Sequence, residues 1–329
     1  MLHDTFNRPI QYLRVSLTDR CNLRCVYCMP AEGIPLMNHD DILRYEEIER
    51  IVRIAVEMGI VHVRLTGGEP LVRKGVPDLA AALARIPGLD DLAMTTNGIL
   101  LSRHADALAK AGLRRVNISL DTLKPERFRQ LTRLGKIDDV LAGREAALAA
   151  GLRPVKINTV VVREMNDDEV VDLARLTLQP DWHLRFIEVM PLGRGAHWSG
   201  DGVVPTGEIR ARVEEALGPL TPVHGAGNGV GPARYYRLPN AGGTLGFISP
   251  VTEHFCYACN RLRLTSNGQV LPCLMSSQAF DLRTPLREGA DDDALREILR
   301  QAIHAKPKGH QLAESILPEC ALPMSCIGG

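Results

Sequence analysis

Apolar and polar residues follow two different patterns along the first two-thirds of the chain. Short runs rich in β-branched residues are typical of buried strands. Between these runs, apolar residues recur at helical spacing; in 45–59 they occupy positions 48, 51, 52, 55 and 56. Gly59, Gly112 and Gly151 each follow such a segment, where glycine commonly ends a helix. We therefore expect helices between strands at 12–18, 61–66, 91–96, 114–121, 154–162 and 183–190.

Strands that alternate with helices predict one parallel α/β sheet. The pattern alone does not separate an open doubly wound sheet from a partial barrel. After about residue 190 the character changes. Segments 191–207 and 224–236 are rich in Gly and Pro and are expected to be loops, and helices are expected at 206–217 and 292–304. Short strands are predicted at 244–249, 261–266 and 269–274, with a hairpin turn at Asn267–Gly268.

Charge and length exclude several classes of protein. The 329 residues contain 39 Lys and Arg and 39 Asp and Glu, so the chain offers no overall field for nucleic acid or an acidic membrane. We find no leader-like start and no apolar run near the roughly 20 residues of a membrane span. The expectation is a soluble, cytoplasmic protein that binds neither nucleic acid nor membrane.

Six of the eight cysteines form two groups of three. Cys21, Cys25 and Cys28 follow the first predicted strand with the spacing C-x3-C-x2-C. In a reducing compartment such a group favours a metal site over disulfides. Three thiolates can hold a [4Fe–4S] cluster that keeps one iron open. A Cys3His zinc site with His39 is the alternative.

The second group, Cys256, Cys259 and Cys273, has the spacing C-x2-C-x13-C. Zinc with His254 or His310 is one interpretation, and a second cluster with an open iron is the other. Cys320 and Cys326 lie outside both groups, and we assign them no role.

The first group, with Tyr27 just before its third cysteine, resembles the signature of the radical S-adenosylmethionine (SAM) enzymes. The resemblance implies a partial (β/α) barrel of the TIM type. It also implies that SAM binds the open iron and is cleaved to a 5′-deoxyadenosyl radical. Matching segments imply SAM contacts by Tyr27, by Gly68 in "RLTGGEP", by Ser119 in "NISLD" and by Met190 in "EVMPLG". By itself a Gly-Gly pair is also an ordinary turn, and Met190 would otherwise be a core residue.

Within that superfamily the chain resembles the GTP 3′,8-cyclases from "YLRVSLTDRCNLRCVYC" to the terminal "IGG". The resemblance implies a barrel over 1–200 and a substrate-binding region over 201–329, whose second [4Fe–4S] cluster binds the purine of GTP. Gly328 and Gly329 would reach into the active site, although two terminal glycines are usually a frayed end. The GTP-binding positions that match are Arg14, Arg64, Thr95, Lys156, Arg261, Leu262 and Arg263. Arg185 is expected near the substrate.

A charged residue on an otherwise apolar strand is better explained by an interior ligand than by solvent. The implied reaction removes H3′ of GTP and forms 3′,8-cyclo-7,8-dihydro-GTP, the first step of molybdenum cofactor biosynthesis. A flavodoxin- or ferredoxin-type reductant, transfer of the product to cyclic pyranopterin monophosphate synthase and a homodimer are also expected. The alternatives are a peptide-modifying radical SAM enzyme and a non-catalytic zinc or electron-transfer protein.

Overall fold

A single curved sheet organises the chain. The computed structural model describes residues 2–190, 192, 197, 200–223, 231–310 and 324–327. In these residues twelve strands form one sheet in the order β12-β11-β10-β1-β2-β3-β4-β5-β6-β9-β8-β7. The central eight, from β10 to β9, are parallel, and the outer strands on both sides are antiparallel. The described strands are β1 (Tyr12–Ser16), β2 (His62–Thr66), β3 (Asp91–Thr96), β4 (Arg115–Ser119), β5 (Lys156–Val161), β6 (His183–Glu188), β7 (Thr221–Pro222), β8 (Arg234–Arg237), β9 (Thr244–Ile248), β10 (Arg261–Leu264), β11 (Gln269–Leu271) and β12 (Phe280–Asp281).

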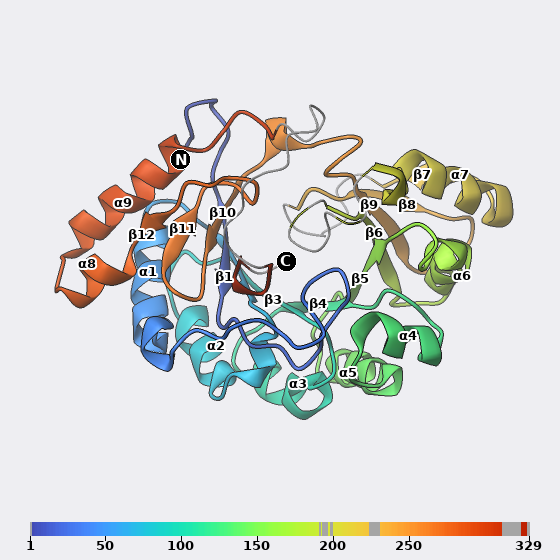
Figure 1. Cartoon of the computed structure of the whole chain (residues 1–329), viewed down its shortest axis with the longest axis horizontal. Helices are drawn as coiled ribbons and strands as arrows, with labels where there is room; N and C mark the ends of the chain where they lie inside the picture. Colours follow the sequence, from blue (N-terminus) through green and yellow to red (C-terminus); the bar gives the residue numbers. More distant parts are fainter. Residues whose placement is uncertain are drawn as a thin grey trace.

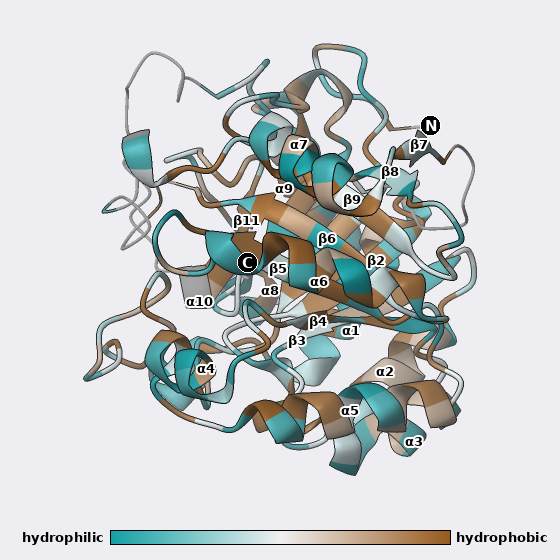
Figure 2. Ribbon diagram, turned by 90° about the vertical axis from the view of Figure 1, so that its right-hand side faces the viewer, coloured by the Kyte–Doolittle hydropathy of each residue, from teal (hydrophilic) through white to brown (hydrophobic). Residues whose placement is uncertain are grey.

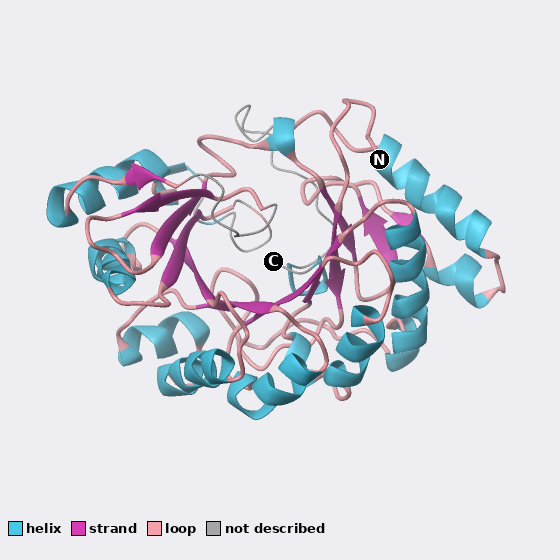
Figure 3. Cartoon of the chain, turned by 180° about the vertical axis from the view of Figure 1, so that it is seen from behind, coloured by secondary structure: helices cyan, strands magenta, loops and turns pink. Residues whose placement is uncertain are grey.

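Helices cover the convex side of this sheet, and its concave side faces the centre of the molecule (Figure 1). The view from behind shows the same arc of strands, which stays open on one side (Figure 3). The sheet is therefore a partial barrel, and the open alternative of a flat doubly wound sheet is excluded. The described α-helices are α1 (Tyr45–Glu57), α2 (Val76–Ala84), α3 (Leu101–Lys110), α4 (Pro125–Thr132), α5 (Ile137–Ala149), α6 (Val170–Arg175), α7 (Thr206–Leu217), α8 (Arg283–Arg287), α9 (Asp292–His304) and α10 (Met324–Ile327).

Each outer helix follows from its pattern of apolar residues. In α1 the residues at helical spacing, Ile48, Ile51 and Val52, are fully or almost fully buried against the sheet. The carboxylate of Glu47 accepts a hydrogen bond of 2.7 Å from the backbone N–H of Arg44, which caps the first turn. Figure 2 shows hydrophobic and hydrophilic residues together on helices such as α5, as expected where one face packs on a sheet.

The two ends of the parallel sheet are built from the C-terminal part of the chain. Strand β9 extends the sheet beyond β6, and β10 extends it on the opposite side beyond β1. The segments before and after residue 200 thus share one sheet, and the division of the chain at this position stays a prediction. Because β10 pairs with β1, the segment that carries Cys256 and Cys259 lies beside the start of β1, whereas Cys21 follows its end.

Most predicted elements are confirmed, with small shifts at their ends. The six predicted strands correspond to β1–β6, and the helices predicted at 206–217 and 292–304 are α7 and α9. Gly268 has φ +84° in the turn between the antiparallel strands β10 and β11, as the hairpin requires. One expectation was wrong: the end of the segment predicted as a loop over 224–236 forms β8, because Tyr235 and Tyr236 pair with Gly246 and Leu245 of β9.

Candidate active site

One cavity of about 380 Å³ lies within the concave side of the sheet, and cysteines of both groups line it. Its wall also includes Arg14 and Arg64 from the first two strands and Met190 from the segment after β6. The two cysteine groups, distant in sequence, therefore open into one space. This is the arrangement needed if a radical formed at one site reacts with a substrate held at the other.

The loop after β1 carries the first cysteine group and is anchored to the end of α4. The backbone N–H groups of Arg24 and Val26 donate to the carbonyls of Thr132 and Leu131, both at 2.9 Å. Arg133, at φ +60°, donates from its guanidinium to the carbonyls of Arg24 (2.8 Å) and Met29 (3.0 Å). These bonds bracket Cys25 and Cys28 and anchor the loop to the end of α4.

Burial raises the pKa of all three thiols of the first group. The pKa of Cys28 is raised to about 12 by burial and then by the neighbouring Cys21 and Cys326. Cys326, on α10, is itself buried, so the tail returns to the first group. Thiols of this kind ionise when a metal replaces the proton.

The Gly67–Gly68 turn at the end of β2 fits tightly against the start of the same loop. A Cβ on Gly68 would lie 2.4 Å from the carbonyl oxygen of Arg20, and one on Gly67 would lie 2.7 Å from that of Thr18. The Gly68 N–H donates to the Thr18 carbonyl at 2.7 Å. The glycines thus allow two stretches of backbone to touch, one residue before Cys21, and Gly68 also lines the cavity.

Glu69, the next residue, was missed by sequence reasoning although it belongs to the same motif. Its carboxylate is fully buried and accepts hydrogen bonds from Thr96 Oγ1 (2.7 Å), Asn97 N (2.6 Å) and Leu71 N (3.1 Å). Burial raises its pKa to about 7 even though these bonds oppose the shift. Glu69 therefore joins the ends of β2 and β3. The available signal was an acidic residue directly after the Gly-Gly pair that follows this strand.

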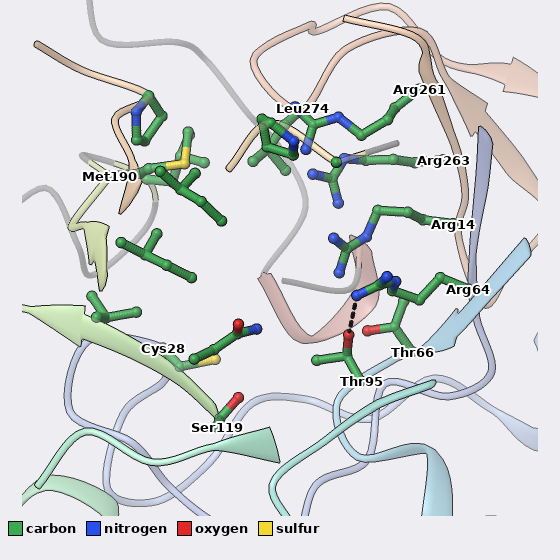
Figure 4. Close-up of a pocket in the computed structure, with 18 of the residues that line it drawn as sticks. Arg14, Cys28, Arg64, Thr66, Thr95, Ser119, Met190, Arg261, Arg263 and Leu274 are labelled. Carbon is green, nitrogen blue, oxygen red and sulfur yellow. Dashed lines mark hydrogen bonds between the residues drawn. The ribbon is translucent and has the colours of Figure 1, made fainter. Parts of the chain in front are cut away.

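The other residues predicted to contact SAM also line the cavity: Tyr27, Ser119 and Met190. Ser119 and Met190 lie on the same side as Cys28 (Figure 4). The Tyr27 hydroxyl donates to Asp121 Oδ2 at 2.5 Å, and Asp121 Oδ1 accepts from the N–H of Val160 at 2.8 Å. Burial raises the pKa of Asp121 to about 6. Asp121, two residues after Ser119 in "NISLD", is a second residue that the sequence analysis missed.

Arginines from three neighbouring strands share one level on the opposite side. Arg263 pairs with Arg14 in the register of β10 and β1, and Arg14 pairs with Arg64 in the register of β1 and β2. Figure 4 shows these three side chains and Arg261 one above another, reaching toward the side that carries Cys28 and Met190. Arg64 also donates to Thr95 Oγ1 at 3.5 Å. Five of the seven GTP-binding positions implied by the resemblance thus line the cavity: Arg14, Arg64, Thr95, Arg261 and Arg263.

Cations in neighbouring positions of a sheet repel one another. Burial, then the Arg263, Arg64 and Arg261 cations, lower the pKa of Arg14 well below its usual value. Burial and neighbouring cations, with weaker opposition from tyrosines and cysteines, lower the pKa values of Arg185 and Arg263 to about 10. Among the described residues, Arg64 Nε and both Nε and Nη2 of Arg185 are buried without a hydrogen-bond partner. The wall is suited to a polyanion, which would satisfy these donors.

Two of the predicted GTP-binding residues lie behind the cavity wall. Lys156 is fully buried, with its Nζ 5.3 Å from the centre of the Tyr235 ring. Burial, followed by Arg185, Arg115 and Arg64, lowers its pKa to about 6. Leu262 is 1% exposed and belongs to the hydrophobic core, because side chains alternate along β10 and its neighbours face the cavity. Leu262 does not line the cavity.

The second cysteine group lies where β10 and β11 meet the segment after α9. Cys256, Cys259 and Cys273 all line the cavity and form no disulfide. Although burial by itself raises the pKa of Cys259, the Arg261 and Lys306 cations lower it to about 6. A thiol of low pKa is readily available as a metal ligand.

The donor sets fit iron–sulfur clusters. Each group offers three free cysteine thiols that open into one cavity, and thiolates are the ligands of such clusters. Within the described part of the chain, no three His, Cys, Asp or Glu side chains converge on a single metal ion. His39 is exposed, while the rings of His254 and His310 pack on each other with centroids 5.5 Å apart. Gly328, Gly329 and Cys320 lie outside the described residues.

Comparisons with known proteins agree with this geometry. Residues 15–177 match the Radical SAM superfamily, and residues 182–312 match the family described as Molybdenum Cofactor Synthesis C. The chain is 54% identical over 326 residues to a GTP 3′,8-cyclase of Heliobacterium modesticaldum, covering 99% of each chain. It is 51% identical to that of Moorella thermoacetica, covering 100% of each.

Among solved structures, Streptococcus suis SuiB has a similar fold, with a TM-score of 0.61 at 16% identity. The match covers 89% of this chain and 68% of that one. None of the helices in the described ranges is long and apolar enough to cross a membrane. With about half of all residues identical to its curated relatives along their full length, the chain belongs to the GTP 3′,8-cyclase family of radical SAM enzymes, which acts in molybdenum cofactor synthesis.

Proposed function

We propose that the cavity holds SAM beside the first cysteine group and GTP between the arginine wall and the second group. The observation that carries the proposal is the row Arg263, Arg14 and Arg64, which faces the side of Cys28 across one cavity (Figure 4). Cys21, Cys25 and Cys28 hold a [4Fe–4S] cluster, and Cys256, Cys259 and Cys273 hold a second one. The first cluster would supply the electron that cleaves SAM to methionine and a 5′-deoxyadenosyl radical. That radical would take H3′ of GTP, C3′ would bond to C8, and one further electron and a proton would complete the dihydro product.

The position of each residue in the cavity decides whether we assign it to SAM or to GTP. Tyr27, Gly68, Ser119 and Met190 form the SAM side of the cavity. Arg14, Arg64, Arg261 and Arg263 bind the phosphates, because guanidinium groups form bidentate hydrogen bonds with phosphate oxygens. Arg185, with two unsatisfied buried nitrogens, lies near the reacting ribose. The tail residues Gly328 and Gly329 are assigned to the active site as well, and the buried Cys326 just before them supports this.

The surroundings of this site are also part of the proposal. A flavodoxin- or ferredoxin-type protein supplies the electron, and cyclic pyranopterin monophosphate synthase takes the product. The protein works in the cytoplasm, where a reducing environment keeps eight cysteines available. It can form a homodimer. Residues 1–200 form the radical SAM unit and 201–329 the substrate-binding unit. These assignments rest on the family.

The direct test is anaerobic turnover with GTP, SAM and dithionite, followed by identification of the product. We expect 3′,8-cyclo-7,8-dihydro-GTP together with 5′-deoxyadenosine. Formation of 5′-deoxyadenosine without any cyclised nucleotide would contradict the proposal for GTP while leaving the radical chemistry intact. An iron and sulfide count of about eight each per chain is expected for two clusters.

A further inference from the structure

Two buried cations from opposite ends of the chain meet at the second cysteine group. Arg8 belongs to the N-terminal segment and is 5% exposed; Lys306 follows α9 and is 3% exposed. Neither was assigned a role from the sequence, and neither is a predicted ligand of GTP. Long cationic side chains are rarely buried this completely unless something specific holds them.

Lys306 bridges two chain segments that each carry a cysteine. Its Nζ donates to the carbonyl of Arg261 and to the carbonyl of Pro272, both at 2.7 Å. Arg261 is two residues after Cys259, and Pro272 directly precedes Cys273. In the register of β10 and β11, where Arg263 pairs with Leu271, Arg261 would lie opposite Cys273. The backbone hydrogen bonds between β10 and β11 end before this position, where the strands separate and present their cysteines. The Lys306 ammonium group joins the two segments there through its own hydrogen bonds.

Arg8 supports the third cysteine and the segment that carries Lys306. Its guanidinium donates to the carbonyl of Cys256 at 2.7 Å, and to those of Pro307 (2.7 Å) and Lys308 (3.0 Å). A buried ion pair with Asp4, 2.6 Å long, fixes Arg8 in this position. Gly309 lies beside Cys256, so that a Cβ there would be 3.6 Å from the Cys256 Cβ. Arg8 or Lys306 thereby binds a backbone carbonyl at, or within two residues of, each cysteine of the group.

Lys306 also brings charge. It lines the cavity with the three cysteines, and it is close enough to Cys259 and Cys273 for each to interact with it electrostatically. A cluster held by three thiolates is negatively charged, and each added electron increases that charge. A buried cation nearby favours the reduced form, because net charge is one of the factors that set the potential of such clusters.

We propose that Lys306, with Arg8 behind it, is a positioning residue of the second cysteine group that also raises the reduction potential of the cluster bound there. The proposal rests on the proposed second cluster. The hydrogen bonds of Arg8 and Lys306 go to Asp4 and to backbone carbonyls beside the second cysteine group. Changes at Lys306 therefore act on the second cluster and leave the first cluster and its SAM binding intact.

The test compares the full-length variants Lys306→Met, Lys306→Gln and Lys306→Arg after anaerobic reconstitution. Lys308→Met is the matched control, because Lys308 lies two residues away and is exposed. Lys306→Met removes both the bridge and the charge, and we expect iron per chain to fall by about half. Lys306→Gln keeps a hydrogen-bond donor without the charge; it should retain more iron, with a second cluster that is harder to reduce in a potentiometric titration. Lys306→Arg should restore both iron content and potential.

Several readouts separate the possible failures. In all variants the spectrum of the first cluster should change on addition of SAM as in the unmodified protein, which also shows that the chain is folded. The inference would be overturned if Lys306→Met or Lys306→Gln had the same iron content and the same second-cluster reduction potential as the control Lys308→Met. If the unmodified protein held only about four irons per chain, the second cluster itself would be contradicted. That result is distinguishable from a failure of the role proposed for Lys306.

Discussion

The Tyr27 hydroxyl donates a hydrogen bond of 2.5 Å to Asp121 Oδ2, which joins the loop of the first cysteine group to the end of β4. The other oxygen of Asp121 accepts from the N–H of Val160 on β5. One buried carboxylate therefore links the loop to two strands of the barrel. Tyr27 and Asp121 both line the cavity, so the bond fixes where the Tyr27 ring lies.

We expect Tyr27→Phe to keep the ring but lose the anchor. The free energy of unfolding should fall by about 1–2 kcal/mol, because the Asp121 carboxylate loses its hydroxyl partner in a buried site. Asp121→Asn should cost a similar amount, and the double variant should cost less than the sum, since both changes remove one bond. Denaturant unfolding of the four proteins checks this. Strictly additive losses would show that the bond does not couple the two residues.

Gly68→Ala should disturb the start of the cysteine loop. The added methyl would lie 2.4 Å from the Arg20 carbonyl oxygen, so one of the two backbones must move. We expect a loss of about 1–3 kcal/mol in unfolding free energy and poor retention of the first cluster. The control is Gly207→Ala in α7, where a Cβ meets nothing within 4 Å. That change should leave iron content unchanged and stabilise the protein by up to about 1 kcal/mol.

Arg64→Gln should weaken GTP binding without destabilising the protein. Loss of one charge-assisted phosphate contact lowers affinity by about tenfold or more. The ligand-free protein loses a cation that repels Arg14, and its free energy of unfolding is expected not to fall. Titration calorimetry with GTP and thermal unfolding measure the two effects. Arg103→Gln, at an exposed position on α3, should change neither quantity. Unaltered affinity in Arg64→Gln would remove this residue from the phosphate site.

We expect GTP binding to depend on pH through Lys156. Its pKa is about 6 in the ligand-free protein, far below its unfolded value, so the side chain is mostly neutral at pH 7. We expect a bound triphosphate to raise this pKa, so that binding takes up a proton. Affinity should fall as pH rises from about 7.5 to 9, where the phosphates no longer titrate. Calorimetry in buffers of different ionisation enthalpy measures the uptake.

Lys156→Arg provides the matched control for this dependence. Arginine stays charged throughout the range, so neither the proton uptake nor the slope with pH should remain. Proton uptake that persists in Lys156→Arg would assign it to another group, such as His183, whose pKa is also lowered by burial and by the Lys156 cation.

The sequence predicted the elements that depend on local patterns. The six strands β1–β6 and the helices α7 and α9 were found because their apolar spacing repeats over enough residues to indicate one buried face. Strand β8 was missed because its short stretch, Arg234–Arg237, has exposed ends and follows a Gly-rich segment. Its stability comes from pairing with β9 and not from its own pattern.

The sequence by itself determined the two cysteine groups, the Gly-Gly turn and the family, because these depend on residue identity and spacing within short segments. Only the tertiary structure decided that Arg263, Arg14 and Arg64 share one level, that Leu262 faces the core and that Lys156 lies behind the wall. It also brought Arg8 and Lys306 from opposite ends of the chain to the same three cysteines. The register between distant strands depends on which surfaces pack together, and so does the burial of a lone cation. The spacing of residues within a short segment does not specify this packing.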